Sequence, residues 1–166
     1  MSGRTVGRIT VGVIIASLVV FWIYVFVVAK PIHDELPDPK YAPAAQAICS
    51  DALTQLRNAG LIEAVAKTPQ QRADLAERAD EVLARQVERL KAIPPGDDTT
   101  RVAVASWLDD WDTWLRDRAA WVVKLRAGED APFLETQDKN GTPSSAALNI
   151  FARVNQMPDC ATPLGI

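Results

Sequence analysis

The first strong pattern along the chain is an uncharged, almost wholly apolar run from Ile9 to Ala29. At ~1.5 Å per residue, a helix of this length crosses the ~30 Å hydrocarbon core of a bilayer. Arg4 and Arg8 are the only charged residues before the run, and the positive-inside tendency holds them in the cytoplasm. The pattern therefore predicts a cytoplasmic N-terminus over residues 1–8, a transmembrane signal-anchor helix over residues 9–30 in the plasma membrane, and an extracytoplasmic remainder.

A cleaved signal peptide is the alternative interpretation, because Val27 and Ala29 stand at the usual positions before a cut at Lys30. The run is longer than the ~7–15 apolar residues of such a peptide, and no polar segment precedes the site. Trp22 and Tyr24 lie toward the outer half of the run, where aromatic rings favour the membrane interface. These features favour an anchor that is retained.

Residues 31–43 contain four prolines among charged and polar residues. This composition predicts a stiff, largely extended stalk. The stalk either lifts the following domain from the bilayer or lies along the surface of that domain. The sequence does not choose between these arrangements.

From residue 44 to residue 166, apolar residues recur at spacings of three and four, which is typical of amphipathic helices. Thr68, Pro69 and Gln71 provide an N-cap, a first-turn proline and a capping-box partner, and Asp97 and Asp98 offer caps for a later helix. The predicted helices start near Pro43 and stop at 58–60, run from Pro69 to Ile93, run from about Asp97 to Ala127, and restart at Thr142.

These segments predict an all-α fold, in which the transmembrane helix is followed by an extracytoplasmic antiparallel bundle of about four helices over residues 44–166. Residues 129–141 have no helical period, and we expect Phe133 and Leu134 within them to pack back onto the core. About 135 residues after the anchor correspond to one ordinary domain.

The charge balance narrows the class of partner. Arg4, Arg8 and Lys30 are the only three of the 18 Lys and Arg up to residue 30, so the part of the chain after residue 30 has 15 basic residues against 21 acidic ones, a formal charge of −6. Such a surface repels nucleic acid and anionic lipid. We therefore expect a protein partner in the membrane or envelope, and no nucleic acid.

The two cysteines, Cys49 and Cys160, open and close the domain. Outside the cell membrane the environment permits oxidation, so a disulfide is the natural pairing. Two unrelated buried thiols are the alternative. A zinc site needs three or four ligands, and the only histidine, His33, lies in the stalk; we therefore expect no metal and no cofactor.

Four of the five tryptophans fall on the third predicted helix, at positions 107, 111, 114 and 121. At ~100° per residue, Trp107, Trp111, Trp114 and Trp121 form one narrow stripe, and Arg118 projects among them. The guanidinium is suited to stacking on the indoles and to pairing with a carboxylate from a neighbouring helix, for instance Asp51, Glu63 or Asp80.

Two interpretations of this stripe remain open. Aromatic residues at helical spacing usually form core, with the arginine in an internal ion pair. Alternatively, some indoles stay exposed and form a partner-binding surface with Arg118, since Trp and Arg are enriched at interface hot spots.

The sequence contains no other strong candidate for a catalytic or metal-binding site. Asp109, Asp110 and Asp112 form the densest acidic cluster, but a straight helix splays them in different directions, unlike the converging oxygens of a calcium site. His33 next to Asp34 lies in the stalk, where nothing orients it for acid–base work. No nucleophile elbow or phosphate loop is present in the sequence.

Four stretches together resemble a known pattern: a cysteine in the first helix, the start Thr68–Leu75, the end of the tryptophan helix at Leu125–Phe133, and the tail Phe151–Ala161. They are similar to a family of actinobacterial single-pass membrane proteins of unknown role. The resemblance implies a cell-envelope setting and brings no activity or catalytic residues.

We therefore expect a non-enzymatic, membrane-anchored envelope protein that acts through protein–protein contacts as an accessory or structural subunit of a membrane complex. The alternative is an extracytoplasmic ligand-binding or sensing module, in which the indole stripe lines a pocket. A carboxylate-dependent hydrolase is a third hypothesis, for which a single sequence provides no geometry.

Overall fold

The computed structural model describes residues 15, 17–19, 21, 35–62 and 65–163. The chain divides into two compact units, Met1–His33 and Asp34–Ile166. The few described residues of the first unit are helical. Among the described residues, no helix has both the length and the apolar character needed to cross a bilayer. The predicted segment 1–8 and most of the predicted span 9–30 lie outside the described residues.

The described part of the second unit forms four α-helices and a short 3-10 helix, with no strand. The helices are α2 (Tyr41–Asn58), α3 (Pro69–Lys91), α4 (Asp98–Arg126), α5 (Ser144–Val154) and η2 (Pro158–Cys160). The predicted all-α helical bundle is therefore confirmed for this unit.

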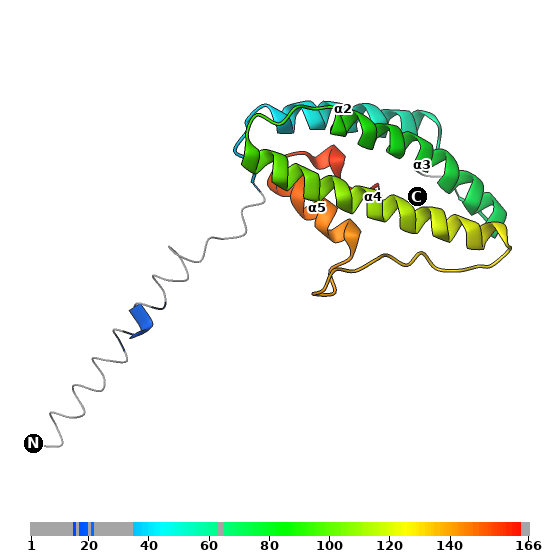
Figure 1. Ribbon diagram of the computed structural model, residues 1–166. Coiled ribbons are helices and arrows are strands. Elements are labelled where there is room, and N and C mark those ends of the chain that lie inside the picture. The colour runs from blue at the N-terminus through cyan, green and yellow to red at the C-terminus, as the bar shows by residue number, and fades with distance from the viewer. Residues whose placement is uncertain (1–14, 16, 20, 22–34, 63–64, 164–166) are drawn as a thin grey trace, which may run out of the picture. The chain divides into compact units, whose positions relative to one another are not determined.

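Neighbouring helices along the chain run in opposite directions (Figure 1). The hydroxyl of Tyr41, at the start of α2, contacts the carbonyl of Leu90 at the end of α3. Arg126, at the end of α4, pairs with Asp74 in the first turns of α3. Helix α3 contacts both α2 and α4, and α5 packs on α4.

The helix ends follow the local signals in the sequence. The side chain of Thr68 accepts a hydrogen bond from Gln71 N (3.2 Å), and the side chain of Gln71 accepts one from Lys67 N (2.9 Å). Asp97 caps α4 by accepting from Thr100 N (2.8 Å). After α2, Gly60 adopts a φ of 64°, a left-handed conformation that glycine reaches without steric cost. These local contacts fix where each helix begins and ends.

Helix α3 presents small side chains to the bulky face of α4. Ala73 and Ala76 of α3 form a buried cluster with Val122 and Leu125 of α4, against which Trp121 packs. Alanines here allow the two helix backbones to approach closely, so the large residues of α4 fill the space between them.

Part of the predicted stalk belongs to the folded domain. Residues 35–40 lie against the domain: Leu36 N donates to Asn155 Oδ1 (2.7 Å), and the Asp38 carboxylate accepts from Gly96 N (2.9 Å). Leu36 and Asp38 are both buried as a result. Helix α2 begins at Tyr41, earlier than the predicted boundary at residue 44. Residues 31–34, including His33, lie outside the described residues.

Residues 127–143, here called the strap, return along α4 without helical structure (Figure 1). Trp121 Nε1 donates to Ala131 O (2.8 Å), and the Asp117 carboxylate accepts from Thr136 N (2.6 Å) and Oγ1 (2.9 Å). Phe133 packs against the core, as predicted. The expectation for Leu134 is wrong, since its side chain is 71% exposed.

Candidate functional site

The predicted disulfide is present. Cys49 of α2 and Cys160 of η2 are bonded, with a Cα–Cα distance of 5.0 Å across 111 residues of sequence. Both residues are fully buried. Next to the bridge, Gln46 Nε2 donates to Asp159 Oδ2 (2.7 Å) and Asp159 N donates to Gln46 Oε1 (3.2 Å). The C-terminal segment is thus attached to α2 by one covalent bond and two hydrogen bonds.

The tryptophan stripe lies in the core. Trp107, Trp111 and Trp114 are 2%, 0% and 3% exposed, and Arg118 is 1% exposed. Only Trp121 is partly accessible. A partner cannot reach the four buried side chains on the folded surface, so the expectation that they form an exposed partner-binding face is corrected. Any contact of a partner with Trp121 stays a prediction.

The cover over the stripe comes from segments distant in sequence. Trp107 stacks on Phe151 of α5 with ring centroids 5.0 Å apart. Phe133 of the strap meets Trp114 edge-on at 6.2 Å and Trp121 at 5.7 Å. Offset and edge-to-face arrangements of this kind stabilise aromatic pairs. Helix α5 and the strap therefore convert the stripe from a surface into core.

Arg118 makes both contacts that its position suggested. Its Cζ lies 4.8 Å from the centroid of the Trp114 ring, and its Nε pairs with Asp80 of α3. Of the other candidate partners, Asp51 pairs with Arg89, and Glu63 lies outside the described residues. Burial raises the pKa of the Asp80 carboxyl more than the adjacent Arg118 lowers it. The pair therefore links α3 to α4 at an electrostatic cost.

Three indole N–H groups in the stripe are buried without a hydrogen-bond acceptor among the described residues: those of Trp107, Trp111 and Trp114. Leaving a buried donor unsatisfied costs about 1–3 kcal/mol. Burial of the large ring surfaces offsets this cost.

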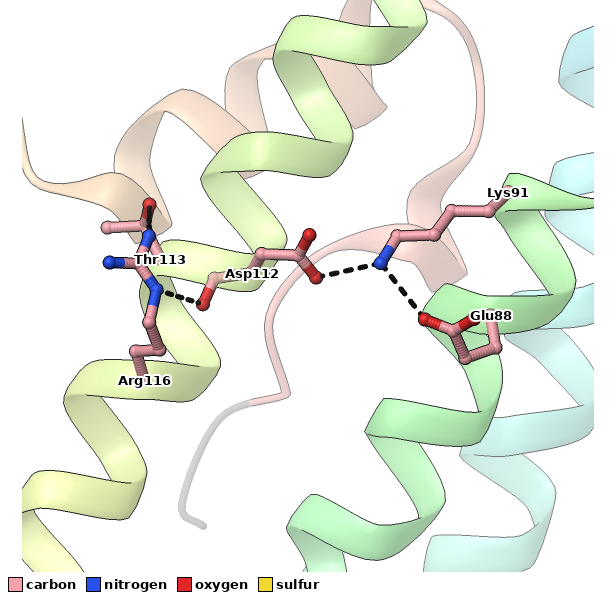
Figure 2. A network of polar contacts seen from close by, with 5 residues as sticks. All are labelled: Glu88, Lys91, Asp112, Thr113 and Arg116. Carbon is pink, nitrogen blue, oxygen red and sulfur yellow. Dashed lines mark hydrogen bonds and ion pairs between the residues drawn. The ribbon is translucent and has the colours of Figure 1, made fainter.

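In the acidic cluster on α4, the carboxylate of Asp112 has a basic partner on α3. Figure 2 shows Lys91 of α3 between Glu88 and Asp112, with Nζ 2.9 Å and 3.1 Å from their carboxylates. The hydrogen bond that Lys91 donates to Glu88 is the main cause that raises the pKa of Lys91, and its contact with Asp112 adds to it. Burial raises the pKa of Asp110, as do the charges of Asp109 and Asp138. Within the described residues, no group of His, Cys, Asp or Glu is placed to hold a metal ion.

Two of the hollows on the described surface are not lined by any tryptophan. One, of about 450 Å³, lies beside the start of α3 and is lined by residues from Val65 to Leu75. The other, of about 530 Å³, is here called the entry hollow. Residues 35–39, the start of α2 from Ala42 to Gln46, and Val154–Gln156 at the end of α5 line it. The tryptophan-lined pocket of the ligand-binding alternative is therefore not among these hollows.

Sequence reasoning missed the entry hollow. Its walls come from segments more than 100 residues apart, and no motif in any of them indicates a shared surface. The one local signal is the short segment Asn155-Gln156-Met157, where the chain turns sharply after α5 without a glycine.

Comparison of the chain with protein-family models, with curated proteins and with solved structures finds no match. The resemblance drawn from the four sequence stretches therefore stays a prediction.

Proposed function

We propose that this protein is a non-enzymatic, membrane-anchored envelope protein that acts through protein–protein contacts, as an accessory or structural subunit of a membrane complex. In this proposal residues 9–30 span the plasma membrane, the N-terminus is cytoplasmic, and the helical domain is extracytoplasmic.

The observation that supports this proposal most directly is the buried Cys49–Cys160 disulfide in a domain that follows a long apolar run. Disulfides persist in oxidising compartments and are rare in the cytosol. The described side chains of the run agree with a lipid-facing helix, because Ile15, Leu18 and Val19 are each more than half exposed. Arg4 and Arg8 precede the run and favour a cytoplasmic N-terminus.

The attachment of the domain also supports a scaffold role. Leu36 is hydrogen-bonded to the C-cap of α5, and Asp38 to the loop between α3 and α4, so the folded unit begins only a few residues after Lys30. In this proposal, so short a connection in sequence favours contacts between the domain and the extracytoplasmic parts of other membrane proteins.

Topology is tested with single cysteines and a membrane-impermeant maleimide. Leu134→Cys, at a side chain that is 71% exposed, should be labelled in intact cells, whereas Ser2→Cys should be labelled only after permeabilisation. Labelling of the Leu134→Cys variant only after permeabilisation would contradict the proposed orientation.

The partner is tested by cross-linking a tagged full-length chain in its native membrane, followed by mild solubilisation and mass spectrometry. A matched control joins residues 1–34 to an unrelated domain. A stoichiometric partner that is captured by the full chain and not by the control supports an accessory subunit. Repeated capture of the same proteins by both would contradict a role for the domain.

A further inference from the structure

The entry hollow is negatively charged and has no basic residue in its lining. Glu35 and Asp38 contribute two carboxylates, and neither Lys nor Arg lines the hollow. The Asp38 carboxylate already accepts hydrogen bonds from Gly96 N and Lys40 N. Glu35 is exposed and has no ion pair among the described residues. The C-terminal end of α5 adds the negative pole of one helix dipole to the lining, and the first turn of α2, with Ala42 and Pro43, adds the positive pole of another.

Apolar side chains form part of the remaining wall, together with the polar side chains of Gln46, Asn155 and Gln156. Leu36, Pro37, Pro39 and Val154 line the hollow beside these carboxylates. Val154 is 41% exposed, although it belongs to the C-terminal turn of α5. An apolar wall next to an unpaired carboxylate fits a long side chain with a hydrocarbon stem and a cationic end.

A strained residue lies at the same place. Gln156 has a φ of 56°, the left-handed region that glycine normally fills after a helix. Its backbone closes α5, because Gln156 N donates to Arg153 O (3.2 Å) and Met157 N to Ala152 O (2.8 Å). Its exposed side chain lines the hollow. Non-glycine residues in this conformation cluster at functional sites, and the side-chain amide of Gln156 adds a hydrogen-bond acceptor to the residues that line the hollow.

We propose that the entry hollow binds a lysine or arginine side chain presented by the extracytoplasmic part of a partner membrane protein. Glu35 forms the ion pair, Gln156 accepts a hydrogen bond, and the proline and valine wall contacts the hydrocarbon stem. This inference rests on the proposed function and names the surface through which the protein contacts its partner.

The test places a photo-cross-linking amino acid at position 154 of the full-length chain in its native membrane. The matched control places it at position 123, since Val123 of α4 is 68% exposed and lies outside the hollow. We expect an adduct from position 154, and not from position 123, that maps within a few residues of a lysine or arginine of one partner.

Two charge variants then test the contact. Glu35→Lys should lower the yield of this adduct about 10-fold, because like charges across a contact are strongly unfavourable. Glu129→Lys, an equal charge change on the strap, should leave the yield unchanged. Exchanging the partner's basic residue for glutamate should restore the adduct with Glu35→Lys. Unchanged melting curves of the variants exclude a loss of folding.

The outcomes separate this inference from the proposed function. A partner that co-purifies normally while position 154 gives no adduct, or gives one far from any basic residue, overturns the inference and leaves the accessory role intact. An adduct to a second copy of this chain also overturns it. If the membrane cross-linking experiment captures no partner, both the proposed function and this inference are contradicted.

Discussion

The Cys49–Cys160 bridge gives the most quantitative prediction. The two residues are 111 apart in sequence, so the bond closes nearly the whole domain into one loop. In the chain-entropy model such a loop destabilises the unfolded state by about 4.8 kcal/mol at 25 °C. A single domain of this size has a total stability of only about 5–15 kcal/mol. Loss of the bridge should therefore leave the domain close to its stability limit.

Thermal unfolding of the full-length chain in mild detergent, followed by circular dichroism, measures this effect. For a unit of about 130 residues, a loss of 4.8 kcal/mol corresponds to a fall in Tm of about 15–20 °C. Three forms are compared: the oxidised protein, the protein reduced under denaturing conditions and refolded in reductant, and Cys49→Ala with Cys160→Ala. The reduced form keeps both sulfur atoms, so its difference from the double alanine variant reports lost packing alone.

The result that would refute this reasoning is a reduced protein whose Tm falls by less than about 4 °C, which corresponds to roughly 1 kcal/mol. The tail would then be held by noncovalent contacts of η2, of which the Gln46–Asp159 hydrogen bonds are the clearest. A large loss in the double alanine variant together with a small loss on reduction would assign the stabilisation to packing instead of to the cross-link.

Three further predictions follow from single contacts. Asp80→Ala should lower the free energy of unfolding by about 3–5 kcal/mol in urea titrations, because it removes the ion-pair partner of the buried Arg118. Adding Arg118→Met to this variant should recover most of the lost stability. Equal losses in the single and the double variant would contradict the ion-pair explanation. Hydrogen bonds from Thr100 hold the pKa of Asp97 below its ordinary value. The stability that the ionised Asp97 side chain contributes is therefore complete above this ordinary pKa, and it is lost as the pH falls through the lowered pKa of the folded state. Asp97→Asn, which keeps a capping oxygen but no charge, should therefore be less stable than the wild type at neutral pH, and the difference should shrink as the pH falls. A difference that stays constant with pH would argue against this explanation. Gln156→Gly should raise the free energy of unfolding by about 0.5–1 kcal/mol, because glycine adopts the left-handed backbone conformation without strain. Gln156→Ala should give no such gain. Equal gains in the two variants would refute the explanation by backbone strain.

Much of the fold was predictable because helix boundaries depend on neighbouring residues. Thr68 and Gln71 cap α3 through contacts three residues apart, and Gly60 ends α2 where the sequence placed a stop. The stalk was predicted less well, since proline content indicates an extended chain but not what it lies against. Leu36 and Asp38 are buried by contacts with Asn155 and Gly96, 119 and 58 residues away.

The candidate site also combines features that the local sequence predicts with features that depend on contacts between distant segments. Periodicity put four tryptophans and Arg118 on one face of α4, and a carboxylate from α3 was among the expected partners of the arginine. It could not show whether that face was covered. Phe151 of α5 and Phe133 of the strap, which belong to other segments of the chain, cover it.

The sequence by itself determined the helices of the domain, their ends, the aromatic face of α4 and the only cysteine pair available, because each depends on residue type and on spacing within one segment. The tertiary structure alone decided that the aromatic face is core, that residues 35–40 join the domain, and that Glu35, Val154 and Gln156 share one hollow. These features depend on which side chains distant in sequence pack together, and such contacts are selected by the burial and hydrogen bonding of the whole fold.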